Sequence, residues 1–435
     1  MVLHWFRRDL RLNDNSALKL AQSSGKDVQC IFIFDKNILD RLEDEFDPRV
    51  TFIHNELKEI DAELRKNGSS LWVFYGDPIV INKVLLKKHP EIDSIYFNRD
   101  YEPYAIKRDK EIAQLYMNCG KFFFDSKDHV IFEKNEIVKN DGTPYSVYSP
   151  YARRWLDQLK ESNYTSENIL IDNISWYKSK INHYPLPSLK SMGFNESHLD
   201  IPSRLPDLNV IKNYDKSRNF PAIKNGTSHL GVHLRFGTIS IRSLVKLALD
   251  KNKVFISELI WRDFYQMVLF HNQHSINKAI KPAYDRIEWL FDKDQFEGWC
   301  NGKTGYPMVD AGMRELNNTG FMHNRVRMVA ASFLTKHLLH DWRLGEAYFA
   351  KKLLDFDLAS NIGGWQWASG SGCDAAPYFR IFNPASQFEK FDNSKAYVEK
   401  WVPELYTEEY PKPIVEHKWA RERALRVYKE GLSSI

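Results

Sequence analysis

Short apolar runs alternate with amphipathic stretches along the first third of the chain. The runs are rich in β-branched and aromatic residues, which is typical of buried strands, and they are Val2–Phe6, Val28–Asp35, Leu71–Gly76, Ile95–Asn98 and Phe122–Asp125. The clearest amphipathic stretch repeats apolar residues at helical spacing, namely Ile53, Leu57, Ile60 and Leu64. Strands that alternate with helices over connections of this length predict an α/β fold with a doubly wound parallel sheet.

The alternation ends near Ser126, and turn-forming residues are frequent from there to Pro206. Beyond that proline the apolar residues recur at helical spacing almost throughout. We therefore predict an α/β domain over residues 1–125, a long interdomain linker over residues 126–190 and an all-α domain over residues 191–435.

Composition indicates a globular protein with little overall charge. Of the 435 residues, 43% are hydrophobic and 27% are charged, and the net charge is only +4. That excess does not by itself indicate nucleic-acid binding, although it permits a local basic face. The four cysteines have no C-x-x-C spacing, so the sequence indicates neither a disulfide framework nor a metal site. No apolar stretch of about 18 residues occurs, and we expect a cytoplasmic monomer with no membrane partner.

The α/β half has neither a G-x-G-x-x-G sequence nor a Walker A sequence, so no glycine pattern indicates a ligand there. In the helical half, Gly226–Gly231 has two hydroxyls ahead of a helical pattern and suits either phosphate oxygens or a simple helix cap. On a helix, one stripe would carry a carboxylate, an indole, a guanidinium and a phenol, at Glu258, Trp261, Arg262 and Tyr265. That stripe is either a solvated face or the wall of a cleft.

Paired charges and paired glycines mark a third segment, over residues 323–384. Its charges suit either a salt-bridge network or a functional site, and they are Arg325, Arg327, Asp355 and Asp357. Gly363 and Gly364 would let the backbone approach something flat and closely packed.

Several of these segments, together with the start of the chain, resemble the photolyase/cryptochrome family. The matching segments are His4–Leu12, Glu258–Arg262, Gly302–Pro307, Trp365–Trp367, Asp374–Pro384 and Tyr410–His417. The resemblance extends over almost the whole chain and is strongest to class I cyclobutane pyrimidine dimer (CPD) DNA photolyases. It implies an α/β domain that can hold an antenna chromophore, and a helical domain that binds FAD beneath a hole for the DNA lesion.

Carried over residue by residue, the resemblance implies an FAD site in the helical half. The contacts to phosphate, ribityl and isoalloxazine would come from Tyr214, Thr227, Ser228, His229, Leu230, Gly231, Phe255, Arg262, Arg327, Asp355, Phe356, Asp357 and Asn361. Asn361 would face flavin N5, where a neutral amide tolerates the fully reduced flavin and therefore favours repair. The chain departs from the family at Gly231, where a serine is usual, and at Phe255, where a tryptophan is frequent.

The same resemblance implies a lesion pocket and a grip on UV-damaged DNA. The pocket would have stacking walls, hydrogen-bonding groups and an apolar floor, formed by Trp261, Trp367, Glu258, Asn324 and Met328. Arg218, Arg325 and Gln387 would hold phosphates around it. Members that repair (6-4) photoproducts have histidines at the positions of Asn324 and Met328, so the CPD is the predicted substrate.

The implied enzyme class is deoxyribodipyrimidine photo-lyase. Excited FADH⁻ would pass one electron to a flipped-out dimer, the cyclobutane bonds would split, and the electron would return. Glu258 would stabilise the dimer radical anion. A relay between the flavin and the surface would consist of Trp365, Trp342 and Trp299.

The antenna chromophore and a second function stay open. Residues 98–109 resemble a folate-binding region, but Tyr104 and Ala105 replace the usual Asn and Glu, so methenyltetrahydrofolate, a deazaflavin, a flavin or an empty cleft remain alternatives. The alternative function is a blue-light photoreceptor without repair activity, although such receptors usually have a C-terminal extension beyond the segment that here ends at His417. A flavin-binding electron carrier would have no use for the lesion-pocket residues.

Overall fold

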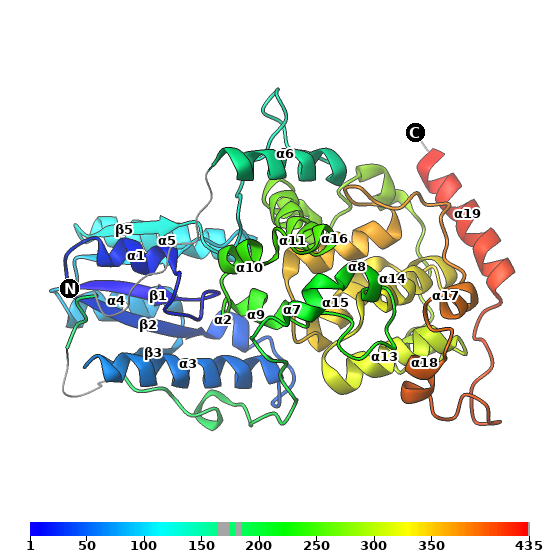
Figure 1. The fold of residues 1–435 in the computed structure, drawn as a ribbon, viewed down its shortest axis with the longest axis horizontal. Coiled ribbons are helices and arrows are strands. Elements are labelled where there is room, and N and C mark those ends of the chain that lie inside the picture. Colours follow the sequence, from blue (N-terminus) through cyan, green and yellow to red (C-terminus); the bar gives the residue numbers. More distant parts are fainter. Residues whose placement is uncertain (163–173, 179–183, 434–435) are drawn as a thin grey trace. The chain divides into compact units, whose positions relative to one another are not determined.

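A five-stranded parallel sheet in the order β3-β2-β1-β4-β5 organises the N-terminal part of the chain (Figure 1). The strands are Val2–Phe6 (β1), Val28–Asp35 (β2), Trp72–Gly76 (β3), Ser94–Asn98 (β4) and Phe122–Ser126 (β5). Each predicted apolar run therefore forms a strand, shifted by no more than one residue at an end. The strand order reverses between β1 and β4, which makes the sheet doubly wound, as predicted.

Helices cover both faces of this sheet because successive side chains of a strand point to opposite faces. On β1, Val2 and Phe6 pack in one cluster with residues of α1 (Ser16–Gln22) and α3 (Pro48–Lys66). Leu3 belongs to the opposite cluster, with residues of α4 (Pro78–Lys88) and α5 (Pro103–Asn118). A short helix, α2 (Lys36–Leu39), follows β2.

The structure is a computed structural model that describes residues 1–162, 174–178 and 184–433. The chain divides into two compact units, and the first consists of Met1–Glu133, Leu159–Leu205 and Leu230–Leu247. The second consists of Lys134–Gln158, Pro206–His229 and Ala248–Ile435. This division differs from the predicted one, because the predicted linker contributes to both units and part of the predicted helical domain belongs to the first. Residues 163–173 and 179–183 of the predicted linker lie outside the described residues.

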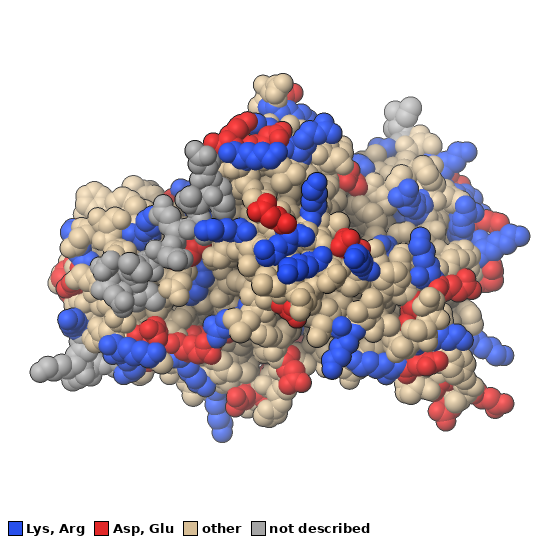
Figure 2. Space-filling model, in the orientation of Figure 1, with Lys and Arg blue, Asp and Glu red and all other residues tan. Residues whose placement is uncertain are grey.

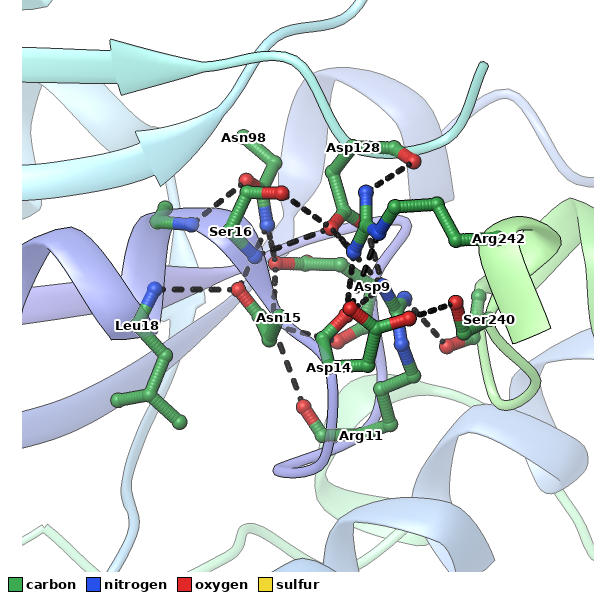
Figure 3. A network of polar contacts seen from close by, with 12 residues as sticks. Asp9, Arg11, Asp14, Asn15, Ser16, Leu18, Asn98, Asp128, Ser240 and Arg242 are labelled. Carbon is green, nitrogen blue, oxygen red and sulfur yellow. Dashed lines mark hydrogen bonds and ion pairs between the residues drawn. The ribbon is translucent and has the colours of Figure 1, made fainter. Parts of the chain in front are cut away.

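Buried ion pairs explain why Leu230–Leu247 belongs with the sheet. This segment contains α9 (Gly231–Phe236) and the start of α10 (Ile241–Ala248). Arg242 donates to Asp14 at 3.0 Å and to the fully buried Asp128 at 2.7 Å, and Asp128 also accepts from Arg11 (Figure 3). A buried carboxylate needs such partners, so the pairing ties α10 to the loops that follow β1 and β5.

The second unit is mainly helical, as predicted. Its helices include most of α6 (Tyr148–Glu161), α7 (Leu208–Lys212), α8 (Tyr214–Ser217), α11 (Lys253–His271), α12 (Lys293–Cys300), α13 (Pro307–Thr319), α14 (Asn324–Ser332), α15 (Trp342–Lys352), α16 (Leu358–Ser369), α17 (Pro384–Phe391), α18 (Ala396–Trp401) and α19 (His417–Ser433). A π-helical turn, Phe333–His337, follows α14 directly. Within the described ranges, no helix is both long and apolar enough to cross a bilayer.

Candidate active site

A cavity of about 390 Å³ lies among helices α11, α14, α15 and α16 of the second unit. Its volume falls within the range of about 300–1,000 Å³ that is typical of ligand sites. The predicted site residues that line it are Arg218, Glu258, Trp261, Arg262, Asn324, Arg327, Met328, Asp355, Asp357, Asn361, Trp365 and Trp367. One cavity therefore contains all five predicted lesion-pocket residues and five of the thirteen predicted flavin contacts.

Helix α11 forms one wall of the cavity. The Asn252 side chain caps its first turn by accepting from the backbone N–H groups of Val254 and Phe255. Within the helix, the predicted stripe of Glu258, Trp261, Arg262 and Tyr265 lines the cavity. The stripe is thus the wall of a cleft and not a solvated face.

Glu258 and Arg218 form a hydrogen-bonded ion pair at this wall. Arg218 directly follows α8, and its guanidinium lies 5.5 Å from the centre of the Tyr214 ring. Burial raises the pKa of Glu258, and Arg218 opposes that shift. The carboxyl can therefore gain a proton when its partner is withdrawn.

Asn361 of α16 has its amide orientation set by Glu346 of α15. The Asn361 Nδ2 donates to the Glu346 backbone oxygen at 3.1 Å and to the Glu346 Oε1 at 2.9 Å. With Nδ2 bound in this way, Oδ1 is the polar atom that Asn361 can present to the cavity. Burial raises the pKa of Glu346, which places this carboxyl in a low-dielectric setting. No sequence pattern indicated Glu346, because only the packing of α15 on α16 brings the two side chains together.

Of the predicted charged residues of the third segment, Arg327 and Asp355 pair with each other, and both line the cavity together with Asp357. The Arg327 Nε donates to the Met322 carbonyl at 2.6 Å, and its Nη2 donates to Asp355 at 3.0 Å. Asp357 caps α16 by accepting from the backbone N–H of Ser360 at 3.0 Å. The salt-bridge interpretation and the functional interpretation therefore both apply to Arg327 and Asp355.

Comparisons with known proteins agree with this architecture. Residues 2–167 match the family model described as DNA photolyase, and residues 255–408 match the FAD binding domain of DNA photolyase. The deoxyribodipyrimidine photo-lyases of Alkalihalophilus pseudofirmus and Escherichia coli are each 34% identical to the chain. Each match covers 98% of this chain, together with 97% of the Alkalihalophilus protein and 98% of the Escherichia coli protein. The chain belongs to the DNA photolyase family.

Solved photolyase structures share the whole fold. A bacterial class III photolyase from Agrobacterium tumefaciens has a TM-score of 0.87 and 33% identity, covering 100% of this chain and 98% of that one. An archaeal photolyase from Sulfolobus tokodaii, described with two FAD molecules, has a TM-score of 0.85 and 34% identity, covering 99% of each chain. A Synechocystis cryptochrome at 24% identity and a TM-score of 0.83 shares the fold. The class I assignment stays a prediction.

The cavity suits the flavin ring of a photolyase. All of its lining residues except Arg218 fall within the matched FAD-binding domain. A Cβ added to Gly364, which lines the cavity, would meet nothing within 4 Å, so the backbone leaves open space there. Polar groups for a ring edge are close by on Asn361, Arg327 and Arg262.

Other predicted flavin contacts lie outside the cavity lining. Tyr214 packs edge-on against Phe255 at 5.2 Å. The hydroxyls of Gly226–Gly231 do not cap α9, since its N-cap is Leu230 and makes no side-chain hydrogen bond. His229 lies against Phe321 at 4.4 Å, and burial lowers its pKa while Asp355 raises it. The lining also excludes Thr227, Ser228 and Phe356.

Two predicted phosphate contacts also lie outside the lining. The Arg325 Nη2 donates to the Asn219 Oδ1 at 2.7 Å, and the guanidinium lies 4.3 Å from the centre of the Phe391 ring. Gln387 of α17 has a buried Oε1 without a hydrogen-bond partner. Both side chains are only partly exposed, so their part in binding DNA stays a prediction.

The structure brings two members of the predicted electron relay close together, and the relay itself stays a prediction. Trp365 lines the cavity, and its ring centre lies 6.0 Å from that of Trp299. Trp299 is 0% exposed, so its own ring does not reach the surface. Trp342 is also buried and lies one turn before Gly345 on α15. A Cβ added to Gly345 would come within 2.1 Å of the Trp365 ring, so α15 packs closely on Trp365 there.

The segment over residues 98–109 forms the end of β4 and much of α5. The Tyr104 hydroxyl donates to Asp35 at 2.6 Å, and Arg108 pairs with Asp109 at 3.1 Å. These contacts stay within the first unit and leave the identity of an antenna chromophore open.

Proposed function

We propose that this protein is a deoxyribodipyrimidine photo-lyase that uses light to split cyclobutane pyrimidine dimers flipped out of DNA. The observation that supports this proposal is the shared cavity, in which flavin-type groups and lesion-type groups face the same space. The chemistry that bound, reduced FAD supplies is light-driven donation of one electron to the dimer, with its return after the cyclobutane C–C bonds break.

The protein binds and orients the dimer. Trp261 and Trp367 provide flat apolar surfaces on which pyrimidines stack. Glu258 and Asn324 offer hydrogen-bonding groups for the pyrimidine edges. When Glu258 is protonated it donates to a carbonyl on which negative charge develops, and burial already favours that state.

In this proposal, Asn361 stabilises the reduced state of the flavin. Its Oδ1, oriented by Glu346, accepts a hydrogen bond from a protonated flavin nitrogen without adding a charge. An aspartate here would place a negative charge beside an anionic flavin and disfavour it.

In this proposal, individual arginines hold the DNA backbone around the cavity. Figure 2 shows basic and acidic side chains interspersed over the visible face, as the net charge of +4 implies. Arg218 lines the cavity, and Arg325 directly follows Asn324, which also lines it. Both arginines therefore suit phosphates around an extruded base. Photolyases are base-flipping enzymes, and a distorted dimer costs less to extrude than an undamaged pair.

The decisive experiment illuminates the chemically reduced protein with an oligonucleotide that contains one thymine dimer. Recovery of base absorbance supports the repair function, and the same mixture in the dark is the control. A matched oligonucleotide with a (6-4) photoproduct should show no recovery, since neither Asn324 nor Met328 is a histidine. No recovery with the dimer would favour the photoreceptor function. Action as a cytoplasmic monomer is part of this proposal, and sedimentation of the protein with and without DNA tests the monomer.

A further inference from the structure

Tyr148, at the start of α6, lies flat against Trp261, one wall of the proposed lesion site. The two ring centres are 3.6 Å apart and the rings are 4° from parallel. Tyr148 is only 9% exposed, so this is a buried stack and not a surface contact. Ring centres this close leave little lateral offset, so the two rings overlap almost completely and each buries one face against the other.

The stack covers one face of the indole with a residue that does not itself line the cavity. Trp261 lines the cavity, whereas Tyr148 does not. Phe264 adds a second support, since its ring meets Trp261 edge-on at 5.6 Å and Tyr148 edge-on at 5.9 Å. The indole is therefore packed against Tyr148 on one face and against Phe264 edge-on, while another part of Trp261 lines the cavity.

Tyr148 is itself held firmly in place. Its hydroxyl lies 2.6 Å from the Ser257 Oγ and 2.8 Å from the Ser257 carbonyl oxygen, on the turn of α11 that precedes Glu258. The chain just before it is anchored too, because the Asp374 backbone N–H donates to the Ser146 carbonyl at 2.9 Å. These contacts lie within the second unit and link α6 to the turn of α11 that carries Glu258.

We propose that Tyr148 is a positioning residue of the lesion site, which acts through Trp261 by holding the indole in its stacking orientation before the dimer arrives. This inference depends on the proposed function of the cavity. Without the stack, the indole would sample other rotamers, and binding would have to order it. Ordering one such side chain weakens binding by about threefold to tenfold.

The test is a double-mutant cycle in the dark, with affinity for a dimer-containing oligonucleotide as the readout. We expect Tyr148→Ala to weaken dimer binding by about threefold to tenfold and Tyr148→Phe, which keeps the ring, to have a much smaller effect. Added to Trp261→Ala, Tyr148→Ala should cause no further loss, because its target is already absent. Binding of the undamaged oligonucleotide should not change.

Two outcomes would overturn the inference: an equal loss from Tyr148→Ala with and without Trp261, or no loss in the otherwise wild-type protein. If Tyr148→Ala fails to fold, Tyr148→Leu keeps apolar bulk without the flat ring and gives the same comparison. FAD content reports whether each variant is intact. A wild-type protein that does not prefer the dimer oligonucleotide contradicts the proposed function itself, whereas a selective wild type with unaffected variants contradicts only the role of Tyr148.

Discussion

Two adjacent glycines of α16 allow a sharp test of the packing that forms the cavity. A Cβ added to Gly363 would lie 2.2 Å from Cδ1 and 2.4 Å from Cε1 of Tyr265 on α11. A Cβ added to Gly364 would meet nothing within 4 Å. Gly363→Ala and Gly364→Ala therefore make the same chemical change one residue apart, and only the first creates a clash.

The magnitudes follow from two opposing effects. Replacing a glycine inside a helix by alanine stabilises the fold by about 1 kcal/mol. Overpacking a rigid interior costs about 1–3 kcal/mol, since either the Tyr265 ring or the α11–α16 spacing must shift. We expect Gly363→Ala to be destabilising by up to about 2 kcal/mol, and Gly364→Ala to stabilise the FAD-free protein by about 0.5–1 kcal/mol.

The assay is urea unfolding of the FAD-free variants, followed by circular dichroism, together with FAD titration. Because Gly364 lines the cavity, its new methyl group would occupy ligand space and weaken FAD binding while the fold gains stability. Opposite signs for stability and FAD affinity at Gly364 would be hard to explain in any other way. A Gly363→Ala protein that gains as much stability as Gly364→Ala would refute the close approach of α16 to Tyr265.

Three further predictions concern electrons and protons. Trp365→Phe should abolish light-driven re-reduction of oxidised FAD but leave repair by chemically reduced protein intact, and loss under both conditions would contradict the relay assignment. Arg218→Gln removes the group that opposes the raised pKa of Glu258, so the pKa of this buried carboxyl should rise further. The variant should therefore lose more stability than the wild type as pH rises above about 4.3, the ordinary pKa of glutamate. Equal slopes of the urea unfolding free energy against pH would contradict this. Burial, with Arg327 and Arg325, lowers the pKa of His323 to about 4. As pH falls, the unfolded chain therefore binds a proton at this histidine before the folded protein does. The free energy of unfolding should thus fall as pH drops from about 6.5 towards 4. His323→Gln should reduce that acid loss, whereas the same change at the exposed His198 should not.

Patterns local in the sequence predicted the elements and one wall of the site. Each apolar run of the first third became a strand, because a short run rich in β-branched and aromatic residues favours a buried strand through its own composition. The stripe on α11 was visible because helical spacing places Glu258, Trp261 and Arg262 on one face regardless of what that face meets. The family resemblance named most of the remaining cavity residues, which local patterns alone left open between packing and chemistry.

Contacts between distant segments were decided only by the tertiary structure. The pairing of Arg242 with Asp14 and Asp128 assigns α10 to the sheet, against the predicted domain boundary. Glu346 beside Asn361 and Tyr148 against Trp261 carry no sequence signal, because each partner comes from another helix. Burial of Trp299 likewise depends on everything packed around it. The sequence by itself determined which residues could do chemistry, and packing determined which of them meet, because burial and hydrogen-bond partners depend on the whole fold and not on neighbours along the chain.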